Sequence, residues 1–400
     1  MSPTMTDDTA ASALLADIDD FIHQHNPETT DRIDFLRARF DAGLAWVQYP
    51  EGLGGRGLDP ELQPVVDGAF AAAGAPDNAP HRNIIGLGMA APTILRFARE
   101  EDKLRWLRPL WTGEEIWCQL FSEPGAGSDL ATAATKAVAD GDDWIVSGQK
   151  VWTSLAHEAS WALLIARTDP TVPKHRGLSY FVCDMKSEGL EVRPLRQLTG
   201  EAEFNEVFLD NVRVPDANRF GELGDGWKVT QSTLMNERVA IGAGSTPREG
   251  GPIGFLTRAW RERTHTHNAA LHDRVLRLWI GAEAARLTTA RLRQQMAAGL
   301  PGPEGSGAKL TYARLAQEIS STEVDLAGHE GLRYDDYTAR RPDLDEESKR
   351  PAAYRFLRTK GNSIEGGTSE IMRNIIAERV LGLPAEPRVD VDVAWKDLPR

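Results

Sequence analysis

The residues best suited to chemistry lie together in one stretch, Trp117 to Leu130, which reads WCQLFSEPGAGSDL. Its small residues allow backbone amides to approach a ligand closely, and Ser122 and Ser128 add two hydroxyl groups. The pattern is that of a strand running into a turn, where a ligand can be bound through the backbone. Taken alone, a Gly-x-Gly beside a proline is better explained as an ordinary surface turn.

A second stretch with chemical groups is GQKVWTS, from Gly148 to Ser154. It places the indole of Trp152 beside the hydroxyls of Thr153 and Ser154 at the end of a β-favouring run. An isolated tryptophan in such a run is more often packed inside a barrel than in contact with a ligand.

A third stretch, IEGGTSEIMRNIIA from Ile364 to Ala377, joins two glycines to a Thr-Ser helix start. The first amides of a helix have no backbone partner, so such a start can bind an anion. Thr368 is equally well explained as a plain helix cap. Acidic side chains stand close by at Glu365 and Glu370.

These motifs lie on a chain whose apolar pattern changes twice. Helical spacing runs to about residue 113, with Thr30 and Asp31 as cap-type residues before the second helical run. β-favouring runs separated by turn signals follow between 116 and 220, and they predict a compact antiparallel barrel or sandwich. The runs are 117–121, 144–146, 161–166, 178–183, 190–192 and 206–209.

The pattern becomes helical again after residue 226. A series of residues at alternating steps of four and three predicts a helix that packs in a bundle. We expect a long mobile excursion over 242–268, which is rich in glycine and then in basic residues, and a helix–helix loop over 302–307. The residues of the packing series are Leu271, Val275, Leu278, Ala282, Ala285, Thr289, Leu292 and Met296.

Length and composition are those of a globular enzyme rather than a disordered or fibrous chain. A chain of 400 residues is too long for one hydrophobic core. The pattern divides it into an N-terminal helical domain over 1–115, a β domain over 116–222 and a C-terminal helical domain over 223–400. The expected fold class is therefore mostly α with a central β domain.

The charge balance excludes some function classes. The chain carries 46 basic and 59 acidic residues, a net charge of −13, which disfavours binding to nucleic acid or to an anionic membrane. No basic leader with an apolar run opens the sequence, and no segment approaches the roughly 18 apolar residues of a membrane helix. Cys118 and Cys183 lie in apolar stretches, as expected of buried thiols in a reducing compartment, so we expect a cytoplasmic protein.

Taken together, the three stretches resemble the signatures of the acyl-CoA dehydrogenase family and occur in the same order. The resemblance implies an N-terminal helical domain, a middle antiparallel β-barrel and a C-terminal four-helix bundle. It also implies FAD as the cofactor and an acyl-CoA thioester as the substrate, and no metal site is expected.

The resemblance implies roles for individual residues. Ser128 would lie near the thioester, and Arg238 and Gly366 match positions on the substrate side. In the family the tryptophan packs on the flavin and a hydroxyl two residues later bonds N5, which points to Trp152 and Ser154. The positions that match FAD-binding residues are Phe121, Ser122, Gly127, Ser128, Trp152, Thr153, Ser154, Thr368 and Glu370.

The activity implied is dehydrogenation of the α,β bond of an acyl-CoA to the trans-2-enoyl-CoA. A carboxylate removes the pro-R α-proton while the β-hydride passes to flavin N5. Because a thioester α-proton is a poor acid, the site must place a base and stabilise an enolate-like oxygen by hydrogen bonds.

Two glutamates compete for the role of base. Common members place the base directly before a single glycine, but this chain has two glycines after Glu365, so Gly366 occupies that position. Members of the isovaleryl and long-chain types carry the base on an earlier helix, which LMNERVA around Glu237 resembles. A solvated ion pair would otherwise explain Glu237 and Arg238. We therefore prefer Glu237 as the catalytic base, with Glu365 as runner-up.

The chain also departs from the family in parts that reach a neighbouring subunit. It lacks an Arg-x-x-Phe-Gly pattern, and DLAGHEG over 325–331 is only a weak match to a loop that reaches a neighbour's FAD. In this it resembles actinobacterial members, some of which act on sterol side-chain thioesters as two-plus-two heteromers.

The expected assembly is thus a homotetramer or heterotetramer in fatty acid or sterol side-chain catabolism. Electron-transfer flavoprotein is the expected electron acceptor. Two alternatives are an acyl-CoA oxidase on the same fold and a partner subunit that completes the flavin site of a heteromeric dehydrogenase.

Overall fold

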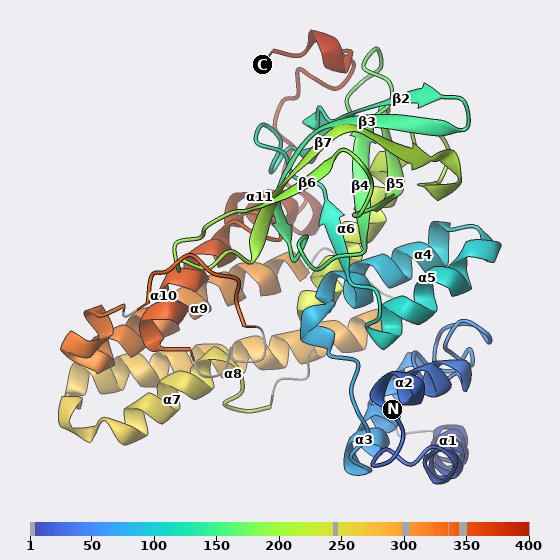
Figure 1. Cartoon of the computed structure of the whole chain (residues 1–400). Helices are drawn as coiled ribbons and strands as arrows, with labels where there is room; N and C mark the ends of the chain where they lie inside the picture. The colour runs from blue at the N-terminus through green and yellow to red at the C-terminus, as the bar shows by residue number, and fades with distance from the viewer. Residues whose placement is uncertain (1–4, 243–246, 298–304, 335, 344–349, 400) are drawn as a thin grey trace.

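The structure, a computed structural model, shows helices, then a β domain, then helices again (Figure 1). This order confirms the predicted fold class, mostly α with a central β domain. None of the described helices is both long and apolar enough to cross a bilayer. The residues described are 5–242, 247–297, 305–334, 336–343 and 350–399, without the side chains of 5–9, 236–242, 293, 296 and 297.

The N-terminal region consists of helices around an aromatic core. The α-helices are α1 (Met5–Gln24), α2 (Arg32–Asp41), α3 (Gln63–Ala72), α4 (Ala91–Phe97) and α5 (Glu100–Thr112). Asp31 caps α2 by accepting hydrogen bonds from two backbone amides, and Gly113 ends α5 with a φ of 79°. Phe21, Phe35 and Phe70 pack edge to face between α1, α2 and α3.

The middle region is one eight-stranded sheet with the order β6-β7-β3-β2-β4-β5-β8 and with β1 beside β4. Its strands are β1 (Trp117–Leu120), β2 (Lys136–Asp140), β3 (Asp143–Ser154), β4 (Trp161–Arg167), β5 (Leu178–Asp184), β6 (Leu190–Pro194), β7 (Phe204–Pro215) and β8 (Arg219–Phe220). The six predicted runs all fall on strands. β2 is not among the runs predicted from the sequence, because Ala137 is its only buried residue. β1 and β2 run parallel to β4, so the expectation of antiparallel pairing throughout is wrong at these two places.

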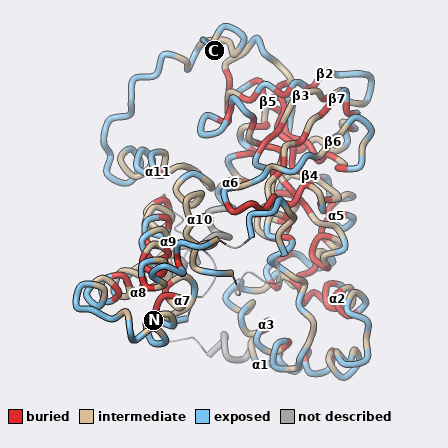
Figure 2. The backbone as a smooth tube through the Cα atoms, turned by 60° about the vertical axis from the view of Figure 1, so that its left-hand side comes forward, coloured by how far each residue is buried: buried red, intermediate tan, exposed pale blue. Residues whose placement is uncertain are grey.

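The central strands β4 and β5 are covered on both faces, which explains their unbroken apolar runs. Leu163 belongs to a core shared with the N-terminal helices, whereas its neighbour Leu164 belongs to a second core inside the β domain. Cys118 and Cys183 lie in that second core as buried free thiols, as predicted. Figure 2 shows much of the buried chain in the β domain, to which these strands belong, and further buried stretches in the helices.

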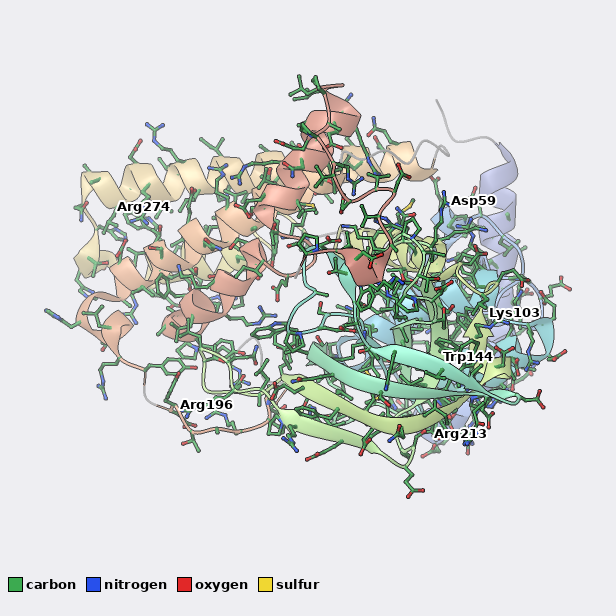
Figure 3. The ribbon with its side chains drawn as sticks, turned by 90° about the horizontal axis from the view of Figure 1, so that it is seen from above. Asp59, Lys103, Trp144, Arg196, Arg213 and Arg274 are labelled. Atoms are coloured by element: carbon green, nitrogen blue, oxygen red, sulfur yellow. The ribbon has the colours of Figure 1, made fainter. Side chains whose placement is uncertain are left out.

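The C-terminal region is helical. Its helices are α6 (Gly226–Gly242), α7 (Pro252–Glu262), α8 (Ala269–Ala297), α9 (Gly305–Ala327), α10 (Ala352–Arg358) and α11 (Ser369–Ile375). The predicted packing series lies on α8, and its residues from Leu271 to Ala285 pack against α7 and α9, as predicted. The side chain of Met296, the last residue of the series, lies outside the described part. Seen from above, Arg274 on α8 and Arg213 on β7 lie at opposite ends of the molecule (Figure 3).

The predicted mobile excursion over 242–268 is wrong for the part that the structure describes. Helix α7 forms there because Ile253 and Leu256 recur at helical spacing and pack into the core with α8 and α9, and Pro252 suits a first helical position. Residues 243–246 lie outside the described residues. Of the predicted loop over 302–307, the part from Gly305 is already helix α9, and 302–304 lie outside the described residues.

Candidate active site

The first two sequence motifs meet where β1 ends beside β3. The backbone amide of Val151 donates to the carbonyl of Ser122 at 2.9 Å, which joins the turn after β1 to the residue before Trp152. Phe121 is buried and packs edge-on against Tyr180, with ring centroids 5.9 Å apart. The tertiary structure thus brings together predicted flavin-binding residues that are about 30 positions apart in sequence.

A buried ion pair supports this junction. The ammonium of Lys150 is fully buried and donates to Glu123 Oε1 at 2.7 Å and to the carbonyls of Phe121 and Ile165. Glu123 also accepts the backbone amides of Ala134 and Thr135 at 2.6 and 3.0 Å. Sequence reasoning missed this pair, although a lysine inside an otherwise β-favouring run was a visible indication of it.

Burial and pairing act in opposite directions on the two charges. Burial alone would raise the pKa of Glu123, but Lys150 and the backbone donors hold that pKa below its usual value. Burial also lowers the pKa of Lys150, and the attraction of Glu123 opposes this effect. The pair fixes the turn after β1 to β3 and β4 through the hydrogen bonds of Lys150.

Trp152 has an unusual backbone and an open side chain. Its φ is 61°, in the left-handed region that a tryptophan rarely adopts, and the register of β3 with β7 shifts between Lys150 and Thr153. The residue is 57% exposed, and its ring packs edge-on against Phe204 with ring centroids 5.9 Å apart. This is not the packed barrel tryptophan that an isolated residue would suggest, and strain of this kind is often found at functional sites.

The two hydroxyls after Trp152 differ in burial. Thr153 is fully buried, and its Oγ1 has no hydrogen-bond partner among the described residues. Ser154 is half-buried and is paired with Phe204 across β3 and β7. An orphaned buried hydroxyl costs free energy, so this position favours a polar partner from outside the chain.

The turn after β1 is open to solvent at its tip. Gly127 and Ser128 are exposed, and no protein atom lies within 4 Å of where a Cβ on Gly127 would stand. Glu123 and Ala126 close the turn by exchanging backbone hydrogen bonds of 3.0 Å in each direction. The tip can therefore present its backbone to a ligand.

The third motif forms the start of α11. Gly366 and Gly367 have φ values of 62° and 91°, which favour glycine at both positions. The Thr368 hydroxyl accepts the amide of Ile371 at 3.2 Å, so Thr368 caps this helix. Glu370 is exposed and pairs with a neighbouring arginine one turn later.

Arg358 joins the third motif to the second. Its Nη1 donates to both carboxylate oxygens of Glu365, at 3.0 and 3.1 Å, and its Nε lies 3.8 Å from Glu203. Its guanidinium also stands 5.7 Å from the ring of Phe204, which contacts Trp152. Burial would lower the pKa of Arg358, but the two glutamates raise it above its usual value. Sequence reasoning did not single out Arg358, because no local pattern distinguishes it.

The preferred base lies on a helix that is anchored between the domains. The hydroxyl of Thr233 on α6 lies 3.0 Å from that of Thr93 and 3.1 Å from that of Tyr180. Glu237 and Arg238 belong to the same helix by their backbone, but their side chains lie outside the described residues. The structure therefore does not test their predicted roles.

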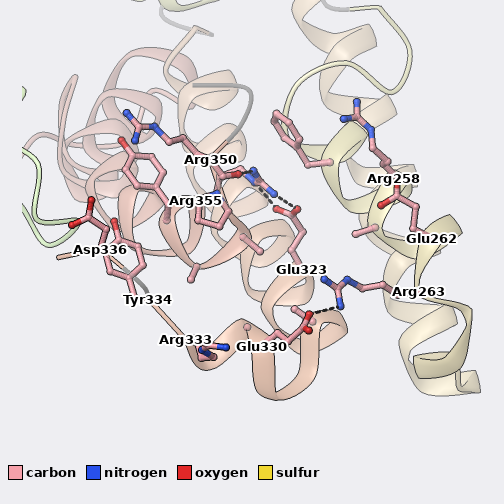
Figure 4. A pocket seen from close by; sticks show the side chains of 18 of the residues that line it. Arg258, Glu262, Arg263, Glu323, Glu330, Arg333, Tyr334, Asp336, Arg350 and Arg355 are labelled. Atoms are coloured by element: carbon pink, nitrogen blue, oxygen red, sulfur yellow. Dashed lines mark hydrogen bonds and ion pairs between the residues drawn. The ribbon is translucent and has the colours of Figure 1, made fainter. Parts of the chain in front are cut away.

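A cavity of about 640 Å³ lies away from these motifs, between α7, α9 and α10 (Figure 4). Glu330 and Gly331 of the weak fourth motif line it. Arg263 pairs with Glu330 at 3.1 Å across the cavity, and Arg355 pairs with Glu323 at 2.6 Å in its wall. The cavity is thus walled by paired charges.

These groups suit a flat, polar ligand better than a metal ion. An exposed indole, hydroxyls and open backbone amides lie where the turn after β1 meets β3, and the residues before α11 are linked to them through Arg358 and Phe204. No cluster of three or more His, Cys, Asp or Glu that could hold a metal occurs in the part of the chain that the structure describes.

Comparison with protein-family models matches the chain in three consecutive parts. The N-terminal domain of acyl-CoA dehydrogenases matches residues 4–114, the middle domain matches 118–212 and the C-terminal domain matches 224–381.

Individual proteins show the same likeness. Acyl-CoA dehydrogenase FadE34 of Mycobacterium tuberculosis is 41% identical over 345 residues, which cover 86% of this chain but only 45% of FadE34. Acyl-CoA dehydrogenase IpdE1 of the same organism is 37% identical over 347 residues, which cover 87% of this chain and 86% of IpdE1. Among solved structures, a chain of the ChsE4-ChsE5 complex from M. tuberculosis superposes with a TM-score of 0.69 at 26% identity, covering 96% of this chain and 100% of that one.

Proposed function

This chain belongs to the acyl-CoA dehydrogenase family, and from that premise we propose that it oxidises an acyl-CoA thioester to the trans-2-enoyl-CoA, with Glu237 as base. The family as a whole consists of flavin-dependent oxidoreductases that act on acyl-CoA. The observation that carries the assignment of the base is the pairing of the competing carboxylate, Glu365, with Arg358.

The residues at the junction of β1 and β3 fit FAD. The orphaned Oγ1 of Thr153, the exposed indole of Trp152 and the open backbone at Gly127 all favour a ligand with a flat ring and polar edges. When bound, FAD supplies the acceptor for the β-hydride. The residues that would hold it are Phe121, Ser122, Gly127, Ser128, Trp152, Thr153, Ser154, Thr368 and Glu370.

Glu365 is poorly suited to act as the base. Both of its oxygens already accept hydrogen bonds from one guanidinium, which fixes their direction and occupies the group that a base would use. Glu237 lies four residues after Thr233 on α6, a spacing that repeats on one face of a helix. Thr233 itself is buried against Tyr180 of the β domain, so this helix is fixed to the β domain just before Glu237.

The chain's own residues then perform the proton transfer. The Glu237 carboxylate takes the pro-R α-proton, and the electron pair left on Cα forms the new double bond as the β-hydrogen departs with its two electrons. Ser128 positions the thioester, and Arg238 and Gly366 line the substrate side. Hydrogen bonds to the thioester oxygen stabilise the enolate character that develops as the proton leaves.

We propose a tetramer, homomeric or heteromeric, that passes its electrons to an electron-transfer flavoprotein. The likeness to a chain of the two-protein ChsE4-ChsE5 complex supports a heteromeric form. The charged cavity beside 325–331, where the family resemblance predicts a contact with a neighbour's FAD, supports an oligomer of either kind. An acyl-CoA oxidase is the alternative, and it would release hydrogen peroxide when the acyl-CoA is added in air.

The test is anaerobic bleaching of the flavin by short, branched, long and steroid acyl-CoAs. We expect wild type and Glu365→Gln to bleach with at least one of them, and Glu237→Gln to bind FAD normally but to bleach at least about a thousandfold more slowly. Normal reduction of Glu237→Gln together with loss in Glu365→Gln would overturn the assignment of the base. Absence of bleaching in wild type, alone and with a partner subunit, would overturn the activity itself.

A further inference from the structure

The C-terminal tail returns from α11 to the β domain and ends against it (Figures 1 and 2). The amide of Trp395 donates to the carbonyl of Val172 at 2.9 Å, and that of Lys396 donates to the carbonyl of Pro170 at 3.0 Å. Ala394 forms an antiparallel bridge with Pro173. We call residues 390–397 the C-terminal strap; its backbone is bound to the loop between β4 and β5.

Trp395 connects the strap to the segment that follows the glycine-rich turn. Its indole Nε1 donates to the carbonyl of Thr132 at 3.0 Å, and its ring lies 4.6 Å from the guanidinium of Arg167. Arg167 is buried and donates to the carbonyls of Ala131 and Ala133 at 2.6 and 3.0 Å. The segment 131–133 is therefore bound both by Arg167 and by the strap.

A second contact lies even closer to the turn. The ammonium of Lys174, 5% exposed, bonds Asp129 at 2.6 Å and also bonds Asp390 of the strap. Asp129 directly follows Ser128 in the sequence. Each carboxylate helps to hold the lysine that binds the other, so the strap is coupled to Asp129 through one buried cation.

We propose that the C-terminal strap positions Ser128 for the acyl-CoA, with Trp395 and Asp390 as its positioning residues. The inference rests on the proposed function, in which Ser128 lies near the thioester. The tip of the turn at Gly127 and Ser128 is exposed and has little packing of its own, so its conformation depends on how the next residues are held. Ordering these residues before the substrate arrives lowers the entropic cost of binding.

The proposal makes a local prediction that does not depend on the substrate. In the FAD-loaded, full-length protein, Trp395→Ala should make amide hydrogen exchange of a peptide spanning 128–134 about fivefold faster, with exchange in α8 and α9 unchanged. Trp395→Phe keeps a ring over Arg167 and should restore most of the protection. Asp390→Asn should act in the same direction, while Glu386→Gln, which removes an exposed acid outside the strap, should change nothing.

The kinetic prediction concerns substrate binding. Trp395→Ala should raise KM for the best acyl-CoA on the order of tenfold while kcat and FAD content change less than about twofold. Unchanged exchange at 128–134 in both Trp395→Ala and Asp390→Asn would overturn the proposal that the strap positions Ser128. Faster exchange in α8 and α9 as well would also overturn it, because that result indicates a global loss of stability. If wild type oxidises no acyl-CoA, the proposed function fails while the exchange experiment still decides the coupling of the strap to the turn.

Discussion

Arg358, the last residue of α10, donates to both carboxylate oxygens of Glu365, at 3.0 and 3.1 Å. Glu365 lies in the motif that leads into α11. The same guanidinium lies beside Phe204, which contacts Trp152 of the β domain. The glutamate next to the double glycine is therefore part of a link between two domains.

A change of this arginine should affect stability without moving the pH dependence of catalysis. Arg358→Lys keeps a charge but loses the planar fork and the contact with Phe204, and we expect it to lower the free energy of unfolding by about 1–2 kcal/mol. Because Glu237 is the proposed base, the acid limb of the pH profile for flavin reduction should stay in place. If Glu365 were the base, loss of its hydrogen-bond partner would change the rate of flavin reduction as well. Stopped-flow reduction across pH distinguishes the two outcomes.

Removal of the buried lysine should destabilise the β domain strongly. Lys150→Met leaves the carboxylate of Glu123 buried without its cation, which costs about 3–5 kcal/mol. The double variant Glu123→Gln with Lys150→Met should regain part of this loss, because the buried charge is then absent as well. Denaturant unfolding of the FAD-loaded proteins at neutral pH measures both changes. Equal stability of Lys150→Met and wild type would contradict the structure of the junction.

The same pair predicts a pH dependence of stability. The pKa of Glu123 is lower in the folded protein than in the unfolded chain, so its contribution is fully present above the unfolded value of about 4.3 and is lost as pH falls through the folded value. The Tm of wild type should therefore decrease below about pH 4.3, and Glu123→Gln should show a smaller decrease over the same interval. Calorimetry in steps of pH checks the difference in slope, and parallel curves would refute it.

Alanine should have different effects at two glycines of the predicted site. On Gly127 a new methyl group meets no protein atom within 4 Å, so Gly127→Ala should leave Tm unchanged and lower only the affinity for FAD. Gly367 has a φ of 91°, and a methyl group there would lie 2.5 Å from Cε of Met372, so Gly367→Ala should lose stability as well, by about 1–2 kcal/mol. Gly68→Ala, in the open on α3, serves as the control with normal flavin content. Full flavin affinity in Gly127→Ala would remove this residue from the predicted site.

Neither Cys118 nor Cys183 should react with a thiol reagent in the native protein. Burial raises the pKa of Cys183 to about 12 and raises that of Cys118 above its usual range. A thiol-specific disulfide reagent should therefore titrate no cysteine in native protein at pH 8 and both after denaturation. Rapid reaction of either thiol without denaturant would contradict the burial of the second core.

Sequence periodicity was sufficient to predict those helices and strands whose apolar pattern matches the burial of their faces in the fold. The strands β4 and β5 are unbroken apolar runs because both of their faces are covered, and such runs are visible without a structure. Helix α2 begins where Asp31 caps it, as the residue type predicts. By contrast, β2 was not predicted because it has few apolar residues. Helix α7 was not predicted because glycines precede its first residue, Pro252.

The chemical character of the candidate site is readable from the amino-acid sequence alone: three motifs with hydroxyls, an indole and glycines, together with their order along the chain. Local spacing carries that information because turns and helix starts depend on neighbouring residues. The fold is needed to see that Glu365 pairs with Arg358, that Glu123 pairs with Lys150, and that Trp395 lies against the segment after Ser128. Such partners are distant in sequence and are chosen by packing and by the cost of leaving a buried charge unpaired, which no local pattern records.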